Sequence, residues 1–309
     1  MYRSLGISFL LFLLTGFGTV SAAPSAELLF ELPWAAAPFY LDSGGEGRPV
    51  QGPGAVSLGP EGEIWILDGL DDRVQVLSES GRLLRSIKLP GHCDLLAVGS
   101  DGRVALWRRH LRAVEVLDSD GDHLGSLPVS LHLGTVRSLA ITPLGEVEME
   151  NAFGERFMLG GPDAPRGLKA VRLDRRHGPV GSLQGCGLRL EQDGLVRLAL
   201  KEGTTGPVRG REGDGQRWTE LDLGEGLRSV RFASPCMGKD LLLELEVADG
   251  PSTVRRSVVR IEDGQVGARL DLASDWLYVP YGRFSCRDQR CVMLHPVADG
   301  LQVWAWGMP

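Results

Sequence analysis

The sequence of 309 residues predicts an all-β fold, a six-bladed β-propeller that is closed by an N-terminal strand completing the last blade. Three observations lead to this prediction: a repeated turn-and-strand unit, a composition rich in turn residues, and a C-terminal unit that lacks one strand. Gly accounts for 42 residues and Pro for 18, whereas aromatic residues make up only 6%. Such a composition suits many tight turns between short strands rather than long helices.

The repeated unit is a turn that ends in Gly and leads into an apolar strand. Its clearest copy is LGPEGEIWI, and similar segments recur five more times along the chain. The turns are centred on Gly62, Gly102, Gly145, Gly194, Gly238 and Gln289. Copies about 40 to 50 residues apart in a β-rich chain are typical of propeller blades with four strands each. The repeats therefore predict six blades.

The first two units each contain four expected strands. In the first unit these are residues 55–58, 63–68, 73–77 and 83–89. The second unit repeats them as DLLAVG, RVALW, AVEVLD and HLGSLPV, each about as long as an ordinary strand. Gly-rich insertions near residues 160–167 and 203–215 interrupt the third and fourth units, so their outer strands are left unassigned.

The C-terminal unit ends one strand short of a complete blade. Its sequence, CVMLHPVADGLQVWAWGMP, supplies three strands before the chain ends. The segment AELLFELPW, residues 26–34, is an apolar strand at the other end of the chain. We expect it to complete the last blade, because a propeller closed in this way has no exposed sheet edge.

The N-terminal residues 1–22 resemble a secretory signal peptide. One Arg precedes an apolar run over residues 7–17, and Val20 and Ala22 occupy the minus-three and minus-one positions of a cleavage site. The apolar run is too short to span a bilayer comfortably. We expect residues 23–309 to form a single propeller domain, without a membrane span after cleavage, that is periplasmic or secreted. An uncleaved N-terminal anchor is the alternative.

One segment of the first unit resembles a known repeat. GAVSLGPEGEIWILDGLDDRVQVLSESGRLL is similar to an NHL repeat, in which an apolar strand, a turn, a strand ending in Asp and an Arg-Val-x-Val strand follow one another. The matching residues are Gly62, Asp68, Arg73, Val74, Val76 and Gly81. The resemblance implies a six-bladed propeller of the NHL or TolB-like kind. It implies little about activity, because one fold serves many functions.

The pair Asp68 and Arg73 has two interpretations. In the repeats that this segment resembles, such a pair bridges two strands of one blade, so we expect a structural role. A ligand-facing ion pair is the alternative. The second unit departs from the pattern, with Trp107 aligned to Asp68 and Ala113 aligned to Arg73.

Charge and motifs argue against several functions. The formal net charge of −7 provides no basic field for nucleic acid, so no nucleic-acid partner is expected. Six-bladed lactone hydrolases, which this fold resembles, hold calcium through Asn, Asp and Glu around the central channel. Here Asn151 is the single Asn, and the expected inner strands carry few carboxylates beyond Glu191. The His residues lack metal-ligand spacing, and no GxSxG, HExxH or P-loop motif occurs.

These observations leave catalytic activity open and favour a non-catalytic protein. We assign no catalytic residue, no metal site and no cofactor. A lactonase-like hydrolase with a site at the channel mouth is the alternative.

Five cysteines follow the signal segment: Cys93, Cys186, Cys236, Cys286 and Cys291. An odd number leaves at least one of them free or paired between molecules in an oxidising compartment. Cys286 and Cys291 form the best candidate disulfide. In SCRDQRCVML they face one another across a hairpin turn, where opposed residues lie within disulfide reach.

Aromatic residues gather in two loops between blades, which flank the closing blade and are expected to be neighbours. They are Trp34, Phe39, Tyr40, Trp276, Tyr278 and Tyr281. Exposed aromatic residues with polar groups are common in recognition surfaces. Packing over the closure is the alternative interpretation.

Two basic clusters are expected on the same face as these loops. Their members are Arg108, Arg109, His110 and Arg112, and Arg175 and Arg176. Together they would suit an anionic group or an acidic protein patch, although charged turns are commonly just solvated. The sequence thus predicts an exported binding or scaffolding module that presents loops between blades to a protein or glycan partner.

Overall fold

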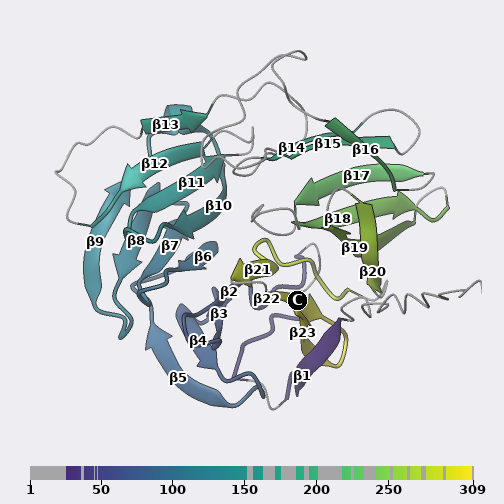
Figure 1. Ribbon diagram of the computed structural model, residues 1–309. Coiled ribbons are helices and arrows are strands. Elements are labelled where there is room, and N and C mark those ends of the chain that lie inside the picture. Colours follow the sequence, from purple (N-terminus) through teal and green to yellow (C-terminus); the bar gives the residue numbers. More distant parts are fainter. Residues whose placement is uncertain are drawn as a thin grey trace, which may run out of the picture.

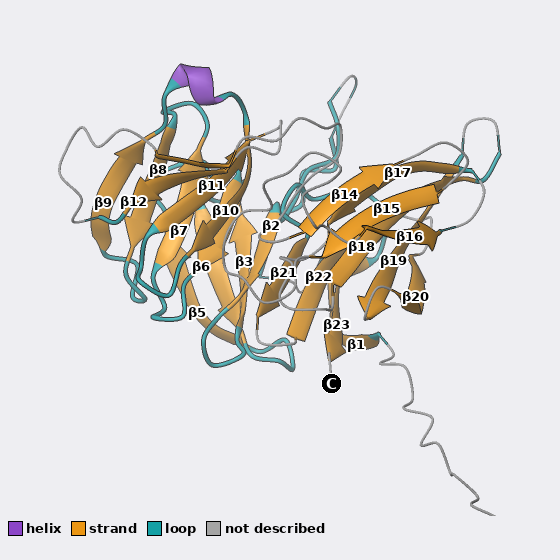
Figure 2. Ribbon diagram, turned by 45° about the horizontal axis from the view of Figure 1, so that its top comes forward, coloured by secondary structure: helices purple, strands orange, loops and turns teal. Residues whose placement is uncertain are grey.

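The computed structural model describes residues 26–35, 38–44, 46, 48–151, 156–162, 171–174, 186–190, 195–200, 218–223, 226–232, 241–250, 253–262, 265–272, 276–287 and 290–307. The sheets in these ranges follow one another around a central axis, as the blades of a β-propeller do (Figure 1). Apart from the 3₁₀ helix Leu131–Leu133, every element in these ranges is a strand (Figure 2). The predicted all-β propeller is confirmed.

The first two blades match the sequence prediction to within one residue at each strand end. The first blade consists of β2 (Ala55–Leu58), β3 (Ile64–Asp68), β4 (Arg73–Leu77) and β5 (Leu83–Lys88). The second consists of β6 (Leu95–Val98), β7 (Val104–Arg108), β8 (Ala113–Leu117) and β9 (His123–Pro128). In both blades successive strands pair antiparallel, with the first strand innermost.

Two further blades have four strands in sequence order. The third blade contains β10 (Val136–Ile141), β11 (Val147–Asn151), β12 (Arg156–Gly160) and β13 (Val171–Asp174). A later blade contains β17 (Leu227–Phe232), β18 (Leu241–Ala248), β19 (Val254–Glu262) and β20 (Gln265–Leu272).

The sheet between these two blades is smaller than predicted. It has three strands, β14 (Cys186–Leu190), β15 (Leu195–Leu200) and β16 (Trp218–Asp222). Because β17 begins at Leu227, the chain has no room for a fourth strand after β16. The expectation of six blades is therefore wrong, and the described residues form five blades of four strands. The Gly-rich segment 203–215 lies outside the described residues.

The closing blade joins the two ends of the described chain. β21 (Phe284–Arg287), β22 (Arg290–Pro296) and β23 (Gly300–Gly307) pair in order, and β1 (Glu27–Pro33) adds to β23 as the outermost strand. The β1 register runs from Glu27 opposite Ala305 to Pro33 opposite Gly300. The predicted closure by an N-terminal strand is confirmed, and Figure 1 shows β1 beside β23.

Apolar side chains between neighbouring blades form the core. One buried cluster joins the first and second blades through Trp65, Leu106 and their neighbours. Another joins the closing blade to the first blade, with Phe30 and Phe39 packed against Ile66. Burial of these flat sheet faces against one another supplies the main stabilisation of a propeller.

The N-terminal residues 1–25 and the two C-terminal residues 308–309 lie outside the described part of the chain. The predicted signal peptide therefore stays a prediction. Within the described ranges, no helix is long and apolar enough to cross a membrane.

Candidate functional site: a loop face and an interblade groove

The second strand of each of the first three blades ends on a polar residue. These residues are Asp68, Arg108 and Asn151, each at the same offset from its repeat glycine. In the strand registers, Asp68 lies opposite Arg73 and Arg108 lies opposite Ala113. The alignment of Trp107 with Asp68 is therefore wrong, because Arg108 occupies that position.

Each of these residues holds the loop that leads into its own blade. The Asp68 carboxylate accepts a hydrogen bond from the Tyr40 backbone N–H at 3.1 Å. Arg108 donates to the Pro90 carbonyl at 3.4 Å, and the Asn151 amide donates to the Leu133 carbonyl at 2.9 Å. We call the face that carries these loops the loop face.

Asp68 is fully buried at the end of β3. Burial raises the pKa of its carboxyl above the usual value, and the Tyr40 N–H and the Arg73 guanidinium partly oppose this rise. Arg73 Nε lies 3.5 Å from the Asp68 carboxylate and Arg73 also pairs with Asp71. The pair joins β3 to β4, which is the arrangement that a structural role requires.

The two aromatic loops contact one another at the closure. The Tyr278 hydroxyl donates to the Pro53 carbonyl at 3.2 Å. Gly282 donates its backbone N–H to the Gly54 carbonyl at 2.9 Å. A parallel bridge thereby pairs Gly282, just before β21, with Ala55 at the start of β2. Burial, with a further contribution from the Asp68 carboxylate, raises the pKa of Tyr278 well above its usual range.

Four of the six aromatic residues pack inward. Phe39 and Trp34 pack in the core between the closing and first blades, and the Trp34 indole donates to the Val297 carbonyl at 2.9 Å. Trp276 stacks on His295, with ring centroids 4.6 Å apart. Together with the partly buried Tyr278, these side chains pack over the closure.

Tyr40 and Tyr281 remain on the surface, with exposed fractions of 55% and 50%. Val279, two residues before Tyr281 in the chain, is also exposed. The Tyr281 hydroxyl donates to the carbonyl of Val136, the first residue of β10, at 3.2 Å. Because Val136 belongs to the third blade, this hydrogen bond fixes the Tyr281 side chain across the loop face.

The basic residues of the β7–β8 turn have different roles. Arg109 is exposed and lies 3.5 Å from the Asp94 carboxylate, so the β7–β8 turn and the loop before β6 lie on the same face. Arg112 donates to the carbonyls of Val129, Ser130 and Gly134 and so supports the loop before the third blade. His110 lies 3.5 Å from the Arg108 guanidinium. Arg175 and Arg176 lie outside the described residues.

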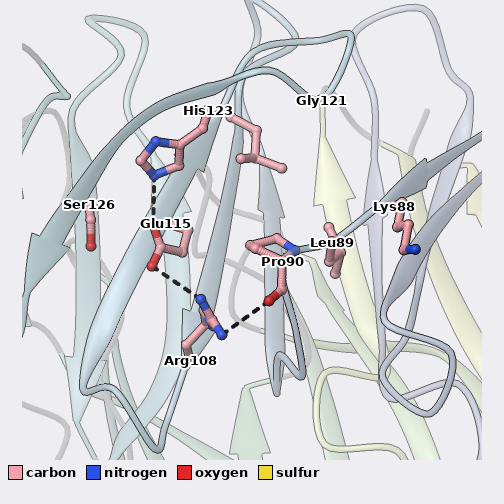
Figure 3. Close-up of a pocket in the computed structure, with 9 residues that line it drawn as sticks. Lys88, Leu89, Pro90, Arg108, Glu115, Gly121, His123 and Ser126 are labelled. Carbon is pink, nitrogen blue, oxygen red and sulfur yellow. Dashed lines mark hydrogen bonds and ion pairs between the residues drawn. The ribbon is translucent and has the colours of Figure 1, made fainter.

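Arg108 points into a groove between the first and second blades (Figure 3). The groove has a volume of about 680 Å³. Its lining consists of Lys88, Leu89, Pro90, Arg108, Glu115, Leu117, Gly121, His123 and Ser126. We refer to it below as the groove.

A buried carboxylate organises the groove. Glu115 projects from the middle of β8, and His123 Nε2 lies 2.8 Å from one of its oxygens. Arg108 Nη1 lies 3.7 Å from the other oxygen. The order His123, Glu115, Arg108 is visible in Figure 3.

The residue equivalent to Glu115 in the first blade is Gln75. Gln75 lies opposite Ile66, and Glu115 lies opposite Leu106, at the same register of the two blades. Gln75 is buried and donates to the Pro38 carbonyl at 2.8 Å. The loop that leads into the first blade therefore covers this position, whereas the shorter loop before the second blade leaves Glu115 in the groove.

Three of the five cysteines have described side chains: Cys93, Cys286 and Cys291. A disulfide joins Cys286 to Cys291, which lie opposite one another in β21 and β22. Cys93 is a buried free thiol, and burial raises its pKa to about 12. Among the described residues, no group of three or more His, Cys, Asp and Glu side chains is placed to hold a metal ion.

Sequence reasoning missed Glu115, His123 and Lys88 as members of one site. Glu115 could have been recognised from the local sequence, since it is an acidic residue inside the apolar strand AVEVL. Lys88 and His123 could not have been recognised from the local sequence, because only the packing of the first blade against the second brings them to the same groove.

No protein-family model matches the chain, and no curated protein sequence matches it. Among solved structures, virginiamycin B lyase from Staphylococcus aureus is similar with a TM-score of 0.49 and 11% identity, over 91% of this chain and 99% of that one. A streptogramin B lyase gives 0.45 and 12%, over 87% and 98%. The β-propeller domain of Myceliophteria thermophila Cps50 (Swd1) gives 0.48 and 8%, over 82% and 95%. Similarities this weak carry no argument about activity or partners.

Proposed function

We propose that this protein is an exported, non-catalytic binding or scaffolding module, which presents its loop face to a protein or glycan partner. The observation that carries the proposal is the exposure of Tyr40 and Tyr281 on loops that are fixed to the ring. Interfaces are enriched in Tyr, because it buries a large apolar area and still offers a hydroxyl group.

The anchoring of these loops supports a recognition role. Tyr40 is held through its backbone N–H by Asp68, and Tyr281 is held through its hydroxyl by Val136. The Tyr281 side chain is already ordered and so loses little conformational entropy on binding, whereas at Tyr40 the backbone alone is held. Val279, in the same loop as Tyr281, adds an exposed apolar side chain.

Two further parts of the proposal rest on the sequence. The signal-like segment 1–22 supports export to the periplasm or the medium. The repeat around Asp68 and Arg73 supports a place among NHL or TolB-like propellers.

Site-specific photo-crosslinking in the source cells tests the loop-face proposal. A benzoylphenylalanine residue at position 281 or 40 is expected to give a discrete crosslinked species, and Tyr40→Ala with Tyr281→Ala is expected to abolish capture of the same partner. The matched control places the crosslinker at Leu144, an exposed residue in the β10–β11 turn on the opposite face. Equal crosslinking from positions 281 and 144, or none from 281 and 40, contradicts the proposal.

The lactonase-like hydrolase remains the alternative function. Turnover of a lactone or ester by the purified protein, with and without added calcium, would favour it over a binding module. We expect no turnover above that of a Tyr278→Phe variant, which keeps the closure packed.

A further inference from the structure

Two neighbouring segments of the loop face each expose a leucine side chain. Leu111, in the turn between β7 and β8, is 52% exposed, and Leu131, in the loop before β10, is 77% exposed. Leu131 begins the 3₁₀ helix, which Figure 2 shows at one end of the molecule. We call these two residues the leucine pair.

Hydrogen bonds fix the two segments to one another. Val129 donates its backbone N–H to the Arg112 carbonyl at 2.7 Å, and the Arg112 guanidinium donates to the Ser130 carbonyl at 2.9 Å. Arg112 and Ser130 are immediate chain neighbours of the leucine pair, so both leucines lie on segments held in place. Arg112 has a φ of 51°, in the left-handed region that residues other than Gly rarely adopt, and these contacts support that conformation.

The fold itself does not require leucine at either position. At the junction of the first and second blades, Leu89 donates its backbone N–H to the Asp72 carbonyl at 2.7 Å, which reproduces the corresponding contact of the second blade. Asp72 has a φ of 49°, so the left-handed conformation is shared as well. In these equivalent segments, Asp71 and Gly91 occupy the positions of the leucine pair. Because adjacent exposed apolar side chains commonly mark interaction sites, the leucine pair is suited to a contact outside the chain.

The surroundings of the leucine pair are positively charged. Segments 108–112 and 129–134 contain three Arg, two His and no Asp or Glu, although the whole chain has a net charge of −7. The Arg112 guanidinium donates to three backbone carbonyls, and no carboxylate of the described residues pairs with it. Arg109 is 57% exposed, with the Asp94 carboxylate 3.5 Å away. This part of the loop face therefore complements a negatively charged partner.

We propose that the leucine pair docks an acidic segment of a partner protein that carries aliphatic or aromatic side chains. The apolar side chains of the segment cover the leucine pair, and its carboxylates lie against Arg109 and the fixed charge of Arg112. Leucine offers neither a ring face nor a polar group, so it suits apolar protein side chains better than a hydroxyl-rich glycan. This inference rests on the proposed function, because the leucine pair belongs to the loop face, and it names the class of partner.

Selection from a display library of random linear peptides on the purified protein tests the inference. The selected peptides are expected to combine acidic residues with leucine or aromatic residues. Their enrichment should disappear when Leu111→Ser with Leu131→Ser replaces the wild type. Absence of enriched peptides, enrichment of peptides without acidic residues, or equal enrichment on both proteins overturns the inference.

Fluorescence polarisation with the most enriched peptide measures the contribution of each group. Leu111→Ser with Leu131→Ser is expected to weaken binding about tenfold or more, because it removes the apolar contact. Arg109→Gln is expected to weaken binding by a smaller factor and to reduce its dependence on salt. Leu144→Ser is the matched control, since it changes an exposed leucine on the opposite face, and its affinity should equal that of the wild type. Equal affinity of the wild type and the double variant contradicts the site, and circular dichroism verifies that each variant is folded.

An anionic lipid surface is the competing occupant of exposed leucines beside basic residues. Co-sedimentation with phosphatidylglycerol vesicles tests it. Vesicle binding that the double variant loses, without enrichment of any peptide, assigns the leucine pair to a membrane surface and overturns the protein segment. Absence of vesicle binding together with peptide binding supports the inference.

A crosslinker at position 131 separates failure of this inference from failure of the proposed function. In the source cells, benzoylphenylalanine at position 131 is expected to capture the same partner as at position 281. Crosslinks from positions 281 or 40 with none from 131 overturn the leucine pair as the docking site and leave the proposed function intact. Absence of crosslinks from all three positions overturns both.

Discussion

Two junctions between neighbouring blades share strand geometry and differ in what covers them. At the closure, the loop that precedes the first blade hydrogen-bonds both Asp68, through the Tyr40 N–H, and the Gln75 amide nitrogen, through the Pro38 carbonyl. At the next junction, the short loop from Leu89 to Asp94 reaches Arg108 only and leaves Glu115 facing the groove. The comparison teaches that an equivalent polar position of the repeat is covered or left at the surface of a groove according to the length of the preceding loop.

The largest effect is expected from removing the strand that completes the closure. Deletion of residues 26–34 exposes the edge of β23 and removes Phe30 from the core. An unpaired edge strand promotes association, so we expect loss of the cooperative unfolding transition and concentration-dependent oligomers in sedimentation velocity. A monomeric deletion variant with wild-type thermal unfolding would contradict the closed ring.

A milder form of this change is Phe30→Ala, which keeps the strand. Truncation of a buried Phe costs about 3–5 kcal/mol in the free energy of unfolding, measured by urea titration. The exposed Leu28→Ala on the same strand is the matched control and is expected to cost far less.

Exchange of the equivalent polar residues tests the comparison directly. Gln75→Glu replaces the donor to the Pro38 carbonyl by a buried acceptor, so it is expected to lower the free energy of unfolding by about 1–3 kcal/mol. Glu115→Gln keeps the hydrogen bond to His123 and is expected to change the free energy of unfolding much less. Urea unfolding of both variants provides the measurement. Equal losses would show that the two junctions are not differently covered.

The strands and the closure could be predicted because they depend on local pattern. Alternating apolar residues and turn glycines placed the strands of the first two blades, and the chain end placed β1 against β23. The number of complete blades could not be predicted, because the chain between β16 and β17 is too short to form a fourth strand. In the site, the position of the aromatic loops followed from the topology. Which tyrosines stay exposed depends on packing, and the meeting of Lys88 with His123 depends on contacts between blades.

A smaller effect is expected from the titration of Asp68. Its folded-state pKa is raised, so the folded protein binds the proton more tightly than the unfolded chain. The contribution of this proton to stability is complete below about pH 3.8, which is the pKa of the carboxyl in the unfolded chain. It is lost as the pH rises through the pKa of the folded state. The stability of the wild type minus that of Asp68→Asn should therefore fall with rising pH across this window. A difference that rises with pH would show that burial does not dominate the pKa of Asp68.

The smallest expected effect concerns the short loop itself. Cys93 is buried in this loop, its thiol contacts the Gly91 carbonyl, and burial raises its pKa to about 12. Because the thiolate is the reactive form, iodoacetamide at pH 8 should label Cys93 slowly in the native protein and readily in urea. Site-resolved mass spectrometry measures both rates. Rapid labelling of the native protein would mean that the loop holding Cys93 opens and does not form a fixed side of the groove.

The most direct measurement compares the equivalent polar positions of the two junctions by thiol labelling in a Cys93→Ser background. Gln75→Cys places a thiol beneath the long loop, and Glu115→Cys places one at the groove. In the native protein, iodoacetamide followed by site-resolved mass spectrometry is expected to show faster labelling at position 115 than at position 75. Equal rates, or faster labelling at position 75, would contradict the distinction between a covered junction and an open one.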